Sequence, residues 1–245
     1  MASYTVVAGH DKVVQFREQS NLLDMEIMTL ARQVHPTVVA GCDFHGLIGG
    51  IQSDGSEAGK CPLAIYSMNA LHGSCYIFVC GSLEENLSRH LNTVKDLARF
   101  FAESWLSGRR SEPSLMTTSA KECAQMFKHL ADTLPRRFQH HVTEIEEILP
   151  LLPSGDYPLV LTHGDLNEMN ILVDPASGKI TGVVDWAEAS AQPFGFALYA
   201  LDNTLGYMGP SGWKYYENAD CLRKAFWTEF AALVGGLHQQ TITYN

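Results

Sequence analysis

The front of the chain combines short apolar runs with one segment of helical periodicity. The β-branched runs "YTVV" and "KVVQFR" flank the spacer "AGHD", which contains Gly9, and this pattern predicts a hairpin. From Asn21 to Val34 apolar residues recur at helical spacing, and His35-Pro36 ends the helix because the residue before proline avoids helical geometry. "HGLIGGIQSDGSEAGK" indicates a Gly-rich polar connection, and "PLAIYSM" at 62–68 predicts another strand.

The pattern becomes helical after residue 82. "LEENLSRHLNTVKDLARFFAESWL" places apolar side chains from Leu87 to Trp105 along one face, which predicts an amphipathic helix. Between two of the later helices, "NILVD" and "ITGVVDW" are joined by the turn "PASGK" and predict a second hairpin. Further helices are expected near 121–130, 138–149 and 221–237.

Strands at the front and helices behind them indicate an α+β fold, since an α/β fold would alternate the two throughout. A chain of 245 residues can hold one large domain or two modest ones. We expect a division near residue 70, with a β-rich part at 1–70 and a mostly helical part at 71–245.

Composition narrows the class of protein. With 46% hydrophobic and 18% charged residues the chain is typical of globular proteins. No apolar run approaches the roughly 18 residues of a membrane span. The first residues also lack the pattern of a secretory signal, so a cytoplasmic protein is expected.

The formal charge of −10 disfavours nucleic acid and anionic membranes as partners and permits a cationic substrate. Six cysteines without a C-x-x-C pair are read as reduced, mostly buried thiols. The oligomeric state is left open.

Candidate chemistry gathers in "LTHGDLNEMNILV" at 161–173 and in the hairpin that follows it. Asp165 and Asn170 lie in the loop, and the returning strand of the hairpin brings Asp185 beside them. Phosphoryl transfer needs a group that receives a hydroxyl proton and oxygen ligands for magnesium, and these three side chains match those tasks. Each residue alone is equally typical of a polar turn, but the combination with Asp185 predicts a site.

"HGDLNEMN" followed by "VVDW" resembles the aminoglycoside phosphotransferase and choline kinase-like family, which has the protein-kinase-like two-lobe fold. The resemblance is strongest to a fungal branch, through "VVQFR", "GDLNEMNILVD", "ITGVVDWAEA", "PFG" and "GW". It implies ATP and Mg²⁺ as cofactors, Asp165 as the catalytic base, and Asn170 and Asp185 as metal ligands. It also implies that His163 braces the loop and that Asn167 lies near the transferred phosphate.

The same resemblance implies a nucleotide lobe that is shortened here. "SYTVV" is similar to the second strand of that lobe, so the first strand and the Gly-rich turn would lie before Met1 and are expected to be missing. In "KVVQFR" the side chains of Gln15 and Arg17 share one face, and either of them occupies the place of the family's basic residue.

Three further features of the nucleotide lobe follow from the resemblance. Glu26 on the predicted helix is the expected ion-pair acid, with Asp24 as a weaker alternative. The stretch "AIYSMNALHG" resembles the hinge that binds adenine through backbone groups. The hinge residues are Ser67, Met68 and Asn69.

The acceptor site is expected downstream of Asp185, with Glu188 and Trp186 as the principal candidates. Their carboxylate and aromatic face suit an amine-bearing substrate, although aromatic residues here are also typical of helix packing. Further candidates are Asp202, Trp213 and Tyr216. The chain is therefore predicted to be an enzyme, an ATP- and Mg²⁺-dependent phosphotransferase. Its acceptor would be a hydroxyl of an amino alcohol, an aminoglycoside-like sugar or a secondary metabolite. The alternative is a non-kinase member of the fold, either a pseudokinase-like binding protein or an enzyme reused for another natural-product reaction.

Overall fold

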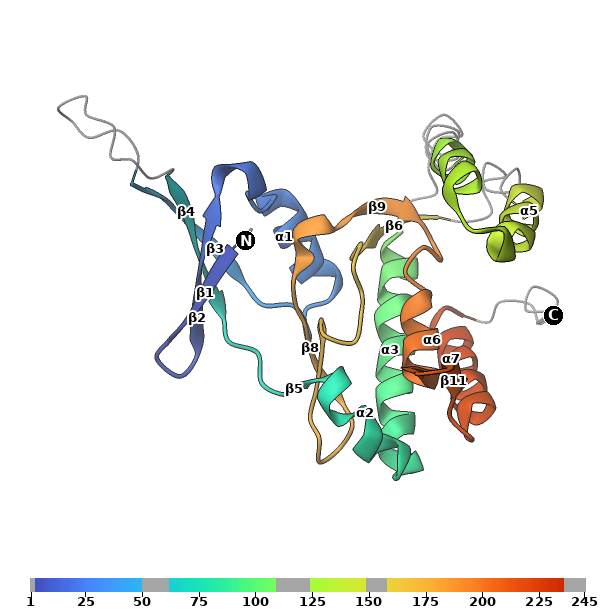
Figure 1. Cartoon of the computed structure of the whole chain (residues 1–245). Helices are drawn as coiled ribbons and strands as arrows, with labels where there is room; N and C mark the ends of the chain where they lie inside the picture. Colours follow the sequence, from blue (N-terminus) through green and yellow to red (C-terminus); the bar gives the residue numbers. More distant parts are fainter. Residues whose placement is uncertain (1–2, 50–61, 109–123, 149–157, 236–245) are drawn as a thin grey trace.

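The computed structural model describes residues 3–49, 62–108, 124–148 and 158–235. Figure 1 shows an antiparallel sheet and, on one side of it, helix α1 (Met25–Val34) followed by a helical part built around α3 (Leu87–Ser107). The expected α+β arrangement, with strands first and helices after them, is confirmed.

The first sheet has four strands in the order β1-β2-β4-β3, and all neighbours are antiparallel. β1 (Ser3–Ala8) and β2 (Lys12–Glu18) form the predicted hairpin, and Gly9 takes the positive φ of +75° that its turn requires. The predicted strand at 62–68 is β4 (Leu63–Asn69), which pairs with both β2 and β3 (Cys42–Ile48).

The reading of "HGLIGGIQSDGSEAGK" as a connection is wrong at its start, because residues 45–48 belong to β3. β3 is an edge strand whose side chains Phe44, Leu47 and Ile48 are about half exposed. Its register shifts between Phe44 and Leu47, where Gly46 has φ +97°. This bulge breaks the period-two pattern by which a strand is recognised in sequence. The rest of the connection, from residue 50, lies outside the described residues.

Helix α1 begins later than its periodicity predicted. Asp24 is its N-cap, and the Asp24 carboxylate accepts the main-chain N–H groups of Glu26 and Ile27 at 2.9 and 3.1 Å. The preceding residues Gln19–Asn21 form a short 3₁₀ turn instead. The helix ends at Val34 with His35 as its C-cap, as the His35-Pro36 pair predicted.

The helical part follows the expected order with shifted boundaries. α2 (Tyr76–Glu84) begins before residue 82, and α3 carries the predicted apolar face. Residues 124–133 are helical where a helix near 121–130 was expected. α5 (Gln139–Ile148) and α7 (Ala219–Leu233) match the other two helices as far as they are described, and α6 (Tyr199–Leu205) is additional. Residues 121–123, 149 and 236–237 lie outside the described part of the chain.

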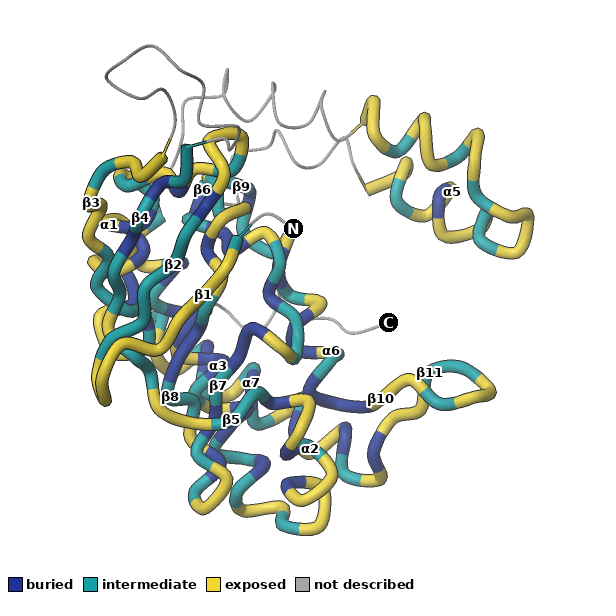
Figure 2. The backbone as a smooth tube through the Cα atoms, turned by 60° about the vertical axis from the view of Figure 1, so that its left-hand side comes forward, coloured by how far each residue is buried: buried dark blue, intermediate teal, exposed yellow. Residues whose placement is uncertain are grey.

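The core of the helical part is aromatic. α3 and α7 pack through Phe101, Phe226 and Phe230, all at most 4% exposed, so these rings are packing residues. Figure 2 shows buried residues along α3, whereas β1 and most of α5 are exposed. None of the helices in the described segments is long and apolar enough to cross a membrane. The expectation that the cysteines are mostly buried is wrong for the four that the structure describes: Cys42, Cys75 and Cys80 are half-buried, and Cys221 is exposed. All four are free thiols.

Seven further short strands complete the fold of the described residues. β7 (Ile171–Val173) and β8 (Ile180–Val183) form the predicted second hairpin, and β5 (Ser74–Cys75) pairs with β7. β6 (Leu159–Thr162) pairs with β9 (Ser190–Pro193), and β10 (Gly206–Gly209) pairs with β11 (Gly212–Tyr215). The loop at 163–170 therefore runs from β6 to β7 and is held at both ends by a strand pair.

Two histidines are buried at the joints of the fold. His35 lies between α1 and α3, with Nδ1 at 2.8 Å from Glu103 Oε2 and Nε2 at 3.2 Å from Ser104 Oγ. His90 Nε2 donates to the carbonyl oxygen of Thr204 at 2.9 Å, and its buried Nδ1 has no hydrogen-bond partner among the residues that the structure describes. Burial lowers the pKa of both imidazoles below the ordinary 6.5, although the Glu103 carboxylate opposes this at His35.

This burial predicts that acid weakens the fold. Because the folded-state pKa lies below 6.5, the unfolded chain binds more protons, so the free energy of unfolding should fall as the pH drops below about 6.5. Each such histidine contributes up to about 1.4 kcal/mol per pH unit. Urea unfolding between pH 5 and 7.5 measures the slope, and His90→Gln should reduce it by about one proton. An unchanged slope in that variant would contradict the assignment.

Candidate active site

The loop at 163–170 is held against the end of β8 by a neutral histidine. His163 is 1% exposed, and its Nε2 lies 2.8 Å from the carbonyl oxygen of Val184, to which it donates. Its Nδ1 accepts the main-chain N–H of Asp165 at 3.3 Å. This pair of contacts requires the tautomer with the proton on Nε2, and burial lowers the pKa of His163 in the same sense. His163 thus connects the backbone of Asp165 with the residue before Asp185.

The Asp165 carboxylate is oriented by two side-chain amides. Asn167 Nδ2 donates to Asp165 Oδ1 at 2.9 Å, and Asn170 Nδ2 donates to Oδ2 at 3.2 Å and to the main-chain oxygen of Asp165 at 2.7 Å. Each carboxylate oxygen keeps a lone pair for a further hydrogen bond. The arrangement therefore fixes a half-buried carboxylate that can still accept a proton from a ligand.

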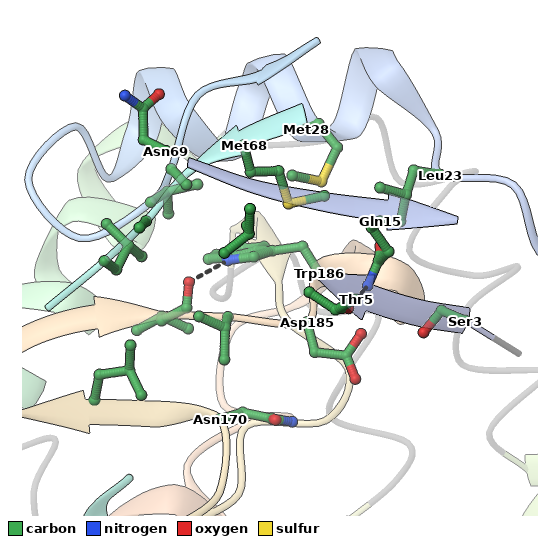
Figure 3. Close-up of a pocket in the computed structure, with 18 of the residues that line it drawn as sticks. Ser3, Thr5, Gln15, Leu23, Met28, Met68, Asn69, Asn170, Asp185 and Trp186 are labelled. Carbon is green, nitrogen blue, oxygen red and sulfur yellow. Dashed lines mark hydrogen bonds between the residues drawn. The ribbon is translucent and has the colours of Figure 1, made fainter. Parts of the chain in front are cut away.

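Asp185 has a strained backbone. Its φ of 63° and ψ of 61° are left-handed, and among the described residues it alone has positive φ without being glycine. Its side chain is exposed and forms no hydrogen bond within the residues that the structure describes. Figure 3 shows the Asp185 carboxylate and the Asn170 amide at the same end of a cavity. Strain of this kind places a charged side chain where an ordinary strand end would not.

Asn170 and Asp185 suit a magnesium ion whose other ligands are water and substrate phosphates. They suit less well a metal ion that is coordinated only by protein side chains. Within the described segments no group of three or more His, Cys, Asp or Glu residues could hold a metal. Asn170 uses its Nδ2 on Asp165, which leaves Oδ1 for a cation, and Asp185 offers a free carboxylate. Mg²⁺ is commonly bound by one or two such oxygens together with water and substrate phosphates.

Tyr199 is a part of the site that the sequence did not reveal. Its hydroxyl accepts the main-chain N–H of Leu166, the residue after Asp165, at 2.7 Å. Burial raises the pKa of Tyr199, as do the charges of Asp165 and Glu188, so the phenol keeps its proton as a donor. Tyr199 lies on α6, and no periodic signal links a helical tyrosine to a loop more than thirty residues earlier.

A cavity of about 580 Å³ lies between the first sheet and the β7–β8 hairpin. Figure 3 shows Ser3, Thr5 and Gln15 above Asp185 on its polar side, whereas Met28 and Met68 line it further along. The remaining lining residues are mostly aliphatic: Val7, Val13, Leu23, Val39, Ala40, Ala70, Leu71, Leu172, Val183 and Val184, together with Arg17, Asn69, Asn170 and Trp186. Its size and its polar end suit a small organic ligand that carries charge.

Gln15 and Arg17 both lie on the cavity side of β2. Arg17 is 5% exposed, and its Nη1 donates to Gln15 Oε1 at 3.0 Å while its Nε donates to the carbonyl oxygen of Asn21 at 2.6 Å. The structure does not bring Glu26 to Arg17: Glu26 is exposed, and no ion pair joins the two within the described residues. The carboxylate of Asp24 is engaged as the cap of α1.

The proposed hinge residues end β4 at the mouth of the cavity. Met68 and Asn69 line it, whereas Ser67 Oγ is bonded to His45 Nε2 at 2.7 Å. The main-chain N–H of Asn69 already donates to Gly41 at 3.2 Å. A ligand at this edge would therefore use other backbone groups.

The two principal acceptor candidates have different surroundings. Glu188 is exposed and near Tyr199, whereas Trp186 is 4% exposed and donates its indole N–H to Val183 O at 3.0 Å. Trp186 packs at 4.7 Å from the ring of His163, so its faces are largely used within the core. Asp202 is exposed on α6, Trp213 is half-buried on β11, and Tyr216, the residue after β11, is buried.

Residues 86–201 match the phosphotransferase enzyme family, also called APH. The match includes the loop at 163–170, Asp185 and Tyr199. Comparison with curated proteins gave no match to this sequence.

Solved structures match almost the whole chain. The GDP complex of wild-type aminoglycoside 2'-phosphotransferase-IIIa is 16% identical, with a TM-score of 0.53 over 97% of this chain and 75% of that one. Aminoglycoside phosphotransferase APH(3'')-Id from Streptomyces rimosus is 14% identical, with a TM-score of 0.53 over 98% and 88%. The same enzyme in complex with ADP and streptomycin gives 0.51. These matches confirm the fold that was predicted from "HGDLNEMN" and "VVDW".

The tight approach of the loop to Glu188 predicts a large effect of Gly164→Ala. Gly164 has φ +83°, and a Cβ there would lie 2.4 Å from the carbonyl oxygen of Glu188. Gly9→Ala is the matched control, since Gly9 has φ +75° and nothing within 4 Å of an added Cβ. We expect Gly9→Ala to lower the free energy of unfolding by about 1 kcal/mol and Gly164→Ala by at least about 1 kcal/mol more. Urea unfolding measures both, and equal losses would contradict the close packing.

Proposed function

Since the family match and the fold indicate a small-molecule kinase, we propose that this chain transfers the γ-phosphoryl group of ATP, with Mg²⁺, to a hydroxyl of a small molecule. The observation that carries the proposal is that Asn170 and Asp185 line one end of a cavity of about 580 Å³, while the Asn170 amide also bonds the Asp165 carboxylate. In this proposal residues 1–70 contribute most of the nucleotide site, and 71–245 contribute the catalytic loop and the acceptor site.

The lining of the cavity supports one orientation of the nucleotide. The aliphatic side chains around Val13, Met68 and Val183 suit the faces of a purine, which gains by leaving water. The buried positive charge of Arg17 and the oxygen ligands of Asn170 and Asp185 suit the phosphate chain with its metal ion. When bound with the nucleotide, Mg²⁺ supplies charge neutralisation at the phosphate oxygens.

The chemical step assigned to this chain is a proton transfer with in-line displacement. The acceptor hydroxyl gives its proton to the Asp165 carboxylate as its oxygen forms a bond to the γ-phosphorus. The bond from that phosphorus to the bridging oxygen breaks, and ADP leaves with the electron pair. The amides of Asn167 and Asn170 hold the carboxylate at a fixed angle, so little reorganisation is needed at the moment of transfer.

Negative charge around the loop supports an acceptor that carries an amine. The charges of Asp165 and Glu188 both raise the pKa of Tyr199, and Asp202 is exposed on the same helix as Tyr199. An amino alcohol, an aminoglycoside-like sugar or an amine-bearing secondary metabolite would meet this field favourably. One relative of the same fold was solved with streptomycin.

The assignment of Asp165 and Asp185 predicts two separable losses. Asp165→Ala should lower kcat by about 100-fold or more with nucleotide affinity nearly unchanged, because it removes the proton acceptor alone. Asp185→Ala should abolish the Mg²⁺-dependent part of nucleotide binding. ATPase assays with a panel of amino alcohols and aminoglycosides, and thermal shift with ATP or GTP with and without Mg²⁺, measure these effects. Full turnover in Asp165→Ala would refute the base assignment, and a wild-type protein that binds neither nucleotide would favour the non-kinase alternative.

We expect the Tyr199→Phe variant to be a slower enzyme with an intact fold. The variant keeps the ring but leaves the Leu166 N–H without its acceptor, so the loop next to Asp165 becomes less ordered. We expect kcat to fall by about tenfold with KM for ATP nearly unchanged, and the melting temperature to fall slightly because the buried Leu166 N–H loses its acceptor. Tyr207→Phe, on the exposed side of β10, is the matched control. Equal kcat in the two variants would show that Tyr199 does not position the loop.

A further inference from the structure

Three polar side chains on the cavity side of the β1–β2 hairpin form one chain of hydrogen bonds. Thr5 on β1 lies directly opposite Gln15 on β2 in the strand register, and Arg17 follows two residues later on the same face. Arg17 Nη1 donates to Gln15 Oε1 at 3.0 Å, and Gln15 Nε2 lies 3.3 Å from Thr5 Oγ1. All three residues line the cavity, and Figure 3 shows Thr5 and Gln15 joined above Asp185.

The direction of this chain follows from its first member. A guanidinium only donates, so the group of Gln15 that faces Arg17 must be the carbonyl oxygen, and the amide NH₂ must face Thr5. Thr5 Oγ1 is then an acceptor from Gln15, and its own hydrogen must point elsewhere. On the cavity face of β1, the free hydroxyl hydrogen is thus available to a ligand.

The positive charge at the start of the chain has no anionic partner in the described residues. Arg17 is 5% exposed and bonds only neutral groups, the Gln15 amide oxygen and the Asn21 carbonyl oxygen. A buried cation paired only with neutral groups carries a desolvation cost, which an anion entering the cavity would offset. The uncompensated charge and the free donor both lie on the wall that faces Asp185.

We propose that Arg17, Gln15 and Thr5 act as one donor relay for the phosphate chain of the nucleotide, with the Thr5 hydroxyl as the terminal phosphate ligand. The proposal rests on the proposed kinase function and deepens it. Gln15 and Arg17, the alternatives for the basic position, then act in series: Arg17 supplies the charge, and Gln15 carries its polarisation to a hydroxyl on the neighbouring strand.

If the hydrogen-bonded chain were purely structural, it would only connect β1 to β2. The effect of each substitution on ligand affinity would then not depend on the number of phosphates on the ligand. The test is therefore calorimetric titration of adenosine, ADP and ATP, each with Mg²⁺, into the wild type and Thr5→Val, Thr5→Ser and Gln15→Leu. Thr29→Val is the matched control, because Thr29 is exposed on α1 and its hydroxyl bonds only the Met25 carbonyl oxygen.

We expect Thr5→Val to weaken ATP binding by about tenfold, the effect of one hydrogen bond to a charged acceptor, with adenosine binding and melting temperature unchanged. Thr5→Ser should restore ATP affinity, and Thr29→Val should leave it unaltered. The Thr5→Val/Gln15→Leu double variant should lose little more than either single variant, because a relay fails as a unit.

The outcomes separate the relay from the function on which it rests. If the wild type binds ATP more tightly than adenosine and Thr5→Val binds it equally well, the relay is refuted while the kinase proposal stands. A loss of adenosine and ATP affinity in equal proportion also refutes it, since the effect would then be structural. If the wild type binds none of the three ligands, the proposed function fails and the relay fails with it.

Discussion

His163 donates one ring N–H to the carbonyl oxygen of Val184 and accepts the main-chain N–H of Asp165 on its other nitrogen. The rest of the site depends on this arrangement because it joins two segments that come from different strand pairs. A protonated imidazole would present a donor to the Asp165 N–H, so only the neutral form can hold the loop. Burial lowers the pKa of His163 and thereby preserves that form.

Trp186 extends this connection into the core. Its indole packs on His163 at 4.7 Å and lies 5.7 Å from His35, which in turn contacts Glu103 and Ser104 on α3. The aromatic side chain next to Asp185 therefore packs against two buried histidine rings. This packing offsets the left-handed backbone of Asp185, a conformation that costs about 1 to 2 kcal/mol for a residue with a Cβ.

Elements with a local signal were predicted well, and elements defined by distant partners were not. The loop with Asp165 and Asn170 and the hairpin leading to Asp185 were visible because turn residues and short apolar runs stand next to one another in the chain. β3 was missed, since an exposed edge strand with a bulge has no period of two. Tyr199 was missed because its partner Leu166 is contributed by another element. The expected pair of Glu26 with Arg17 is absent from the described residues, where Gln15 takes the guanidinium instead.

The sequence by itself determined the fold class and the identity of the polar residues that meet at the loop. These depend on spacing within about twenty residues, over which strand, turn and helix periods are read directly. Only the tertiary structure decided which nitrogen of His163 carries the proton and that Asp185 is left-handed. It also decided that Arg17, Gln15 and Thr5 are joined in one direction across two strands. Those features follow from strand register, burial and the donor or acceptor character of neighbours, which a chain acquires only when distant segments pack together.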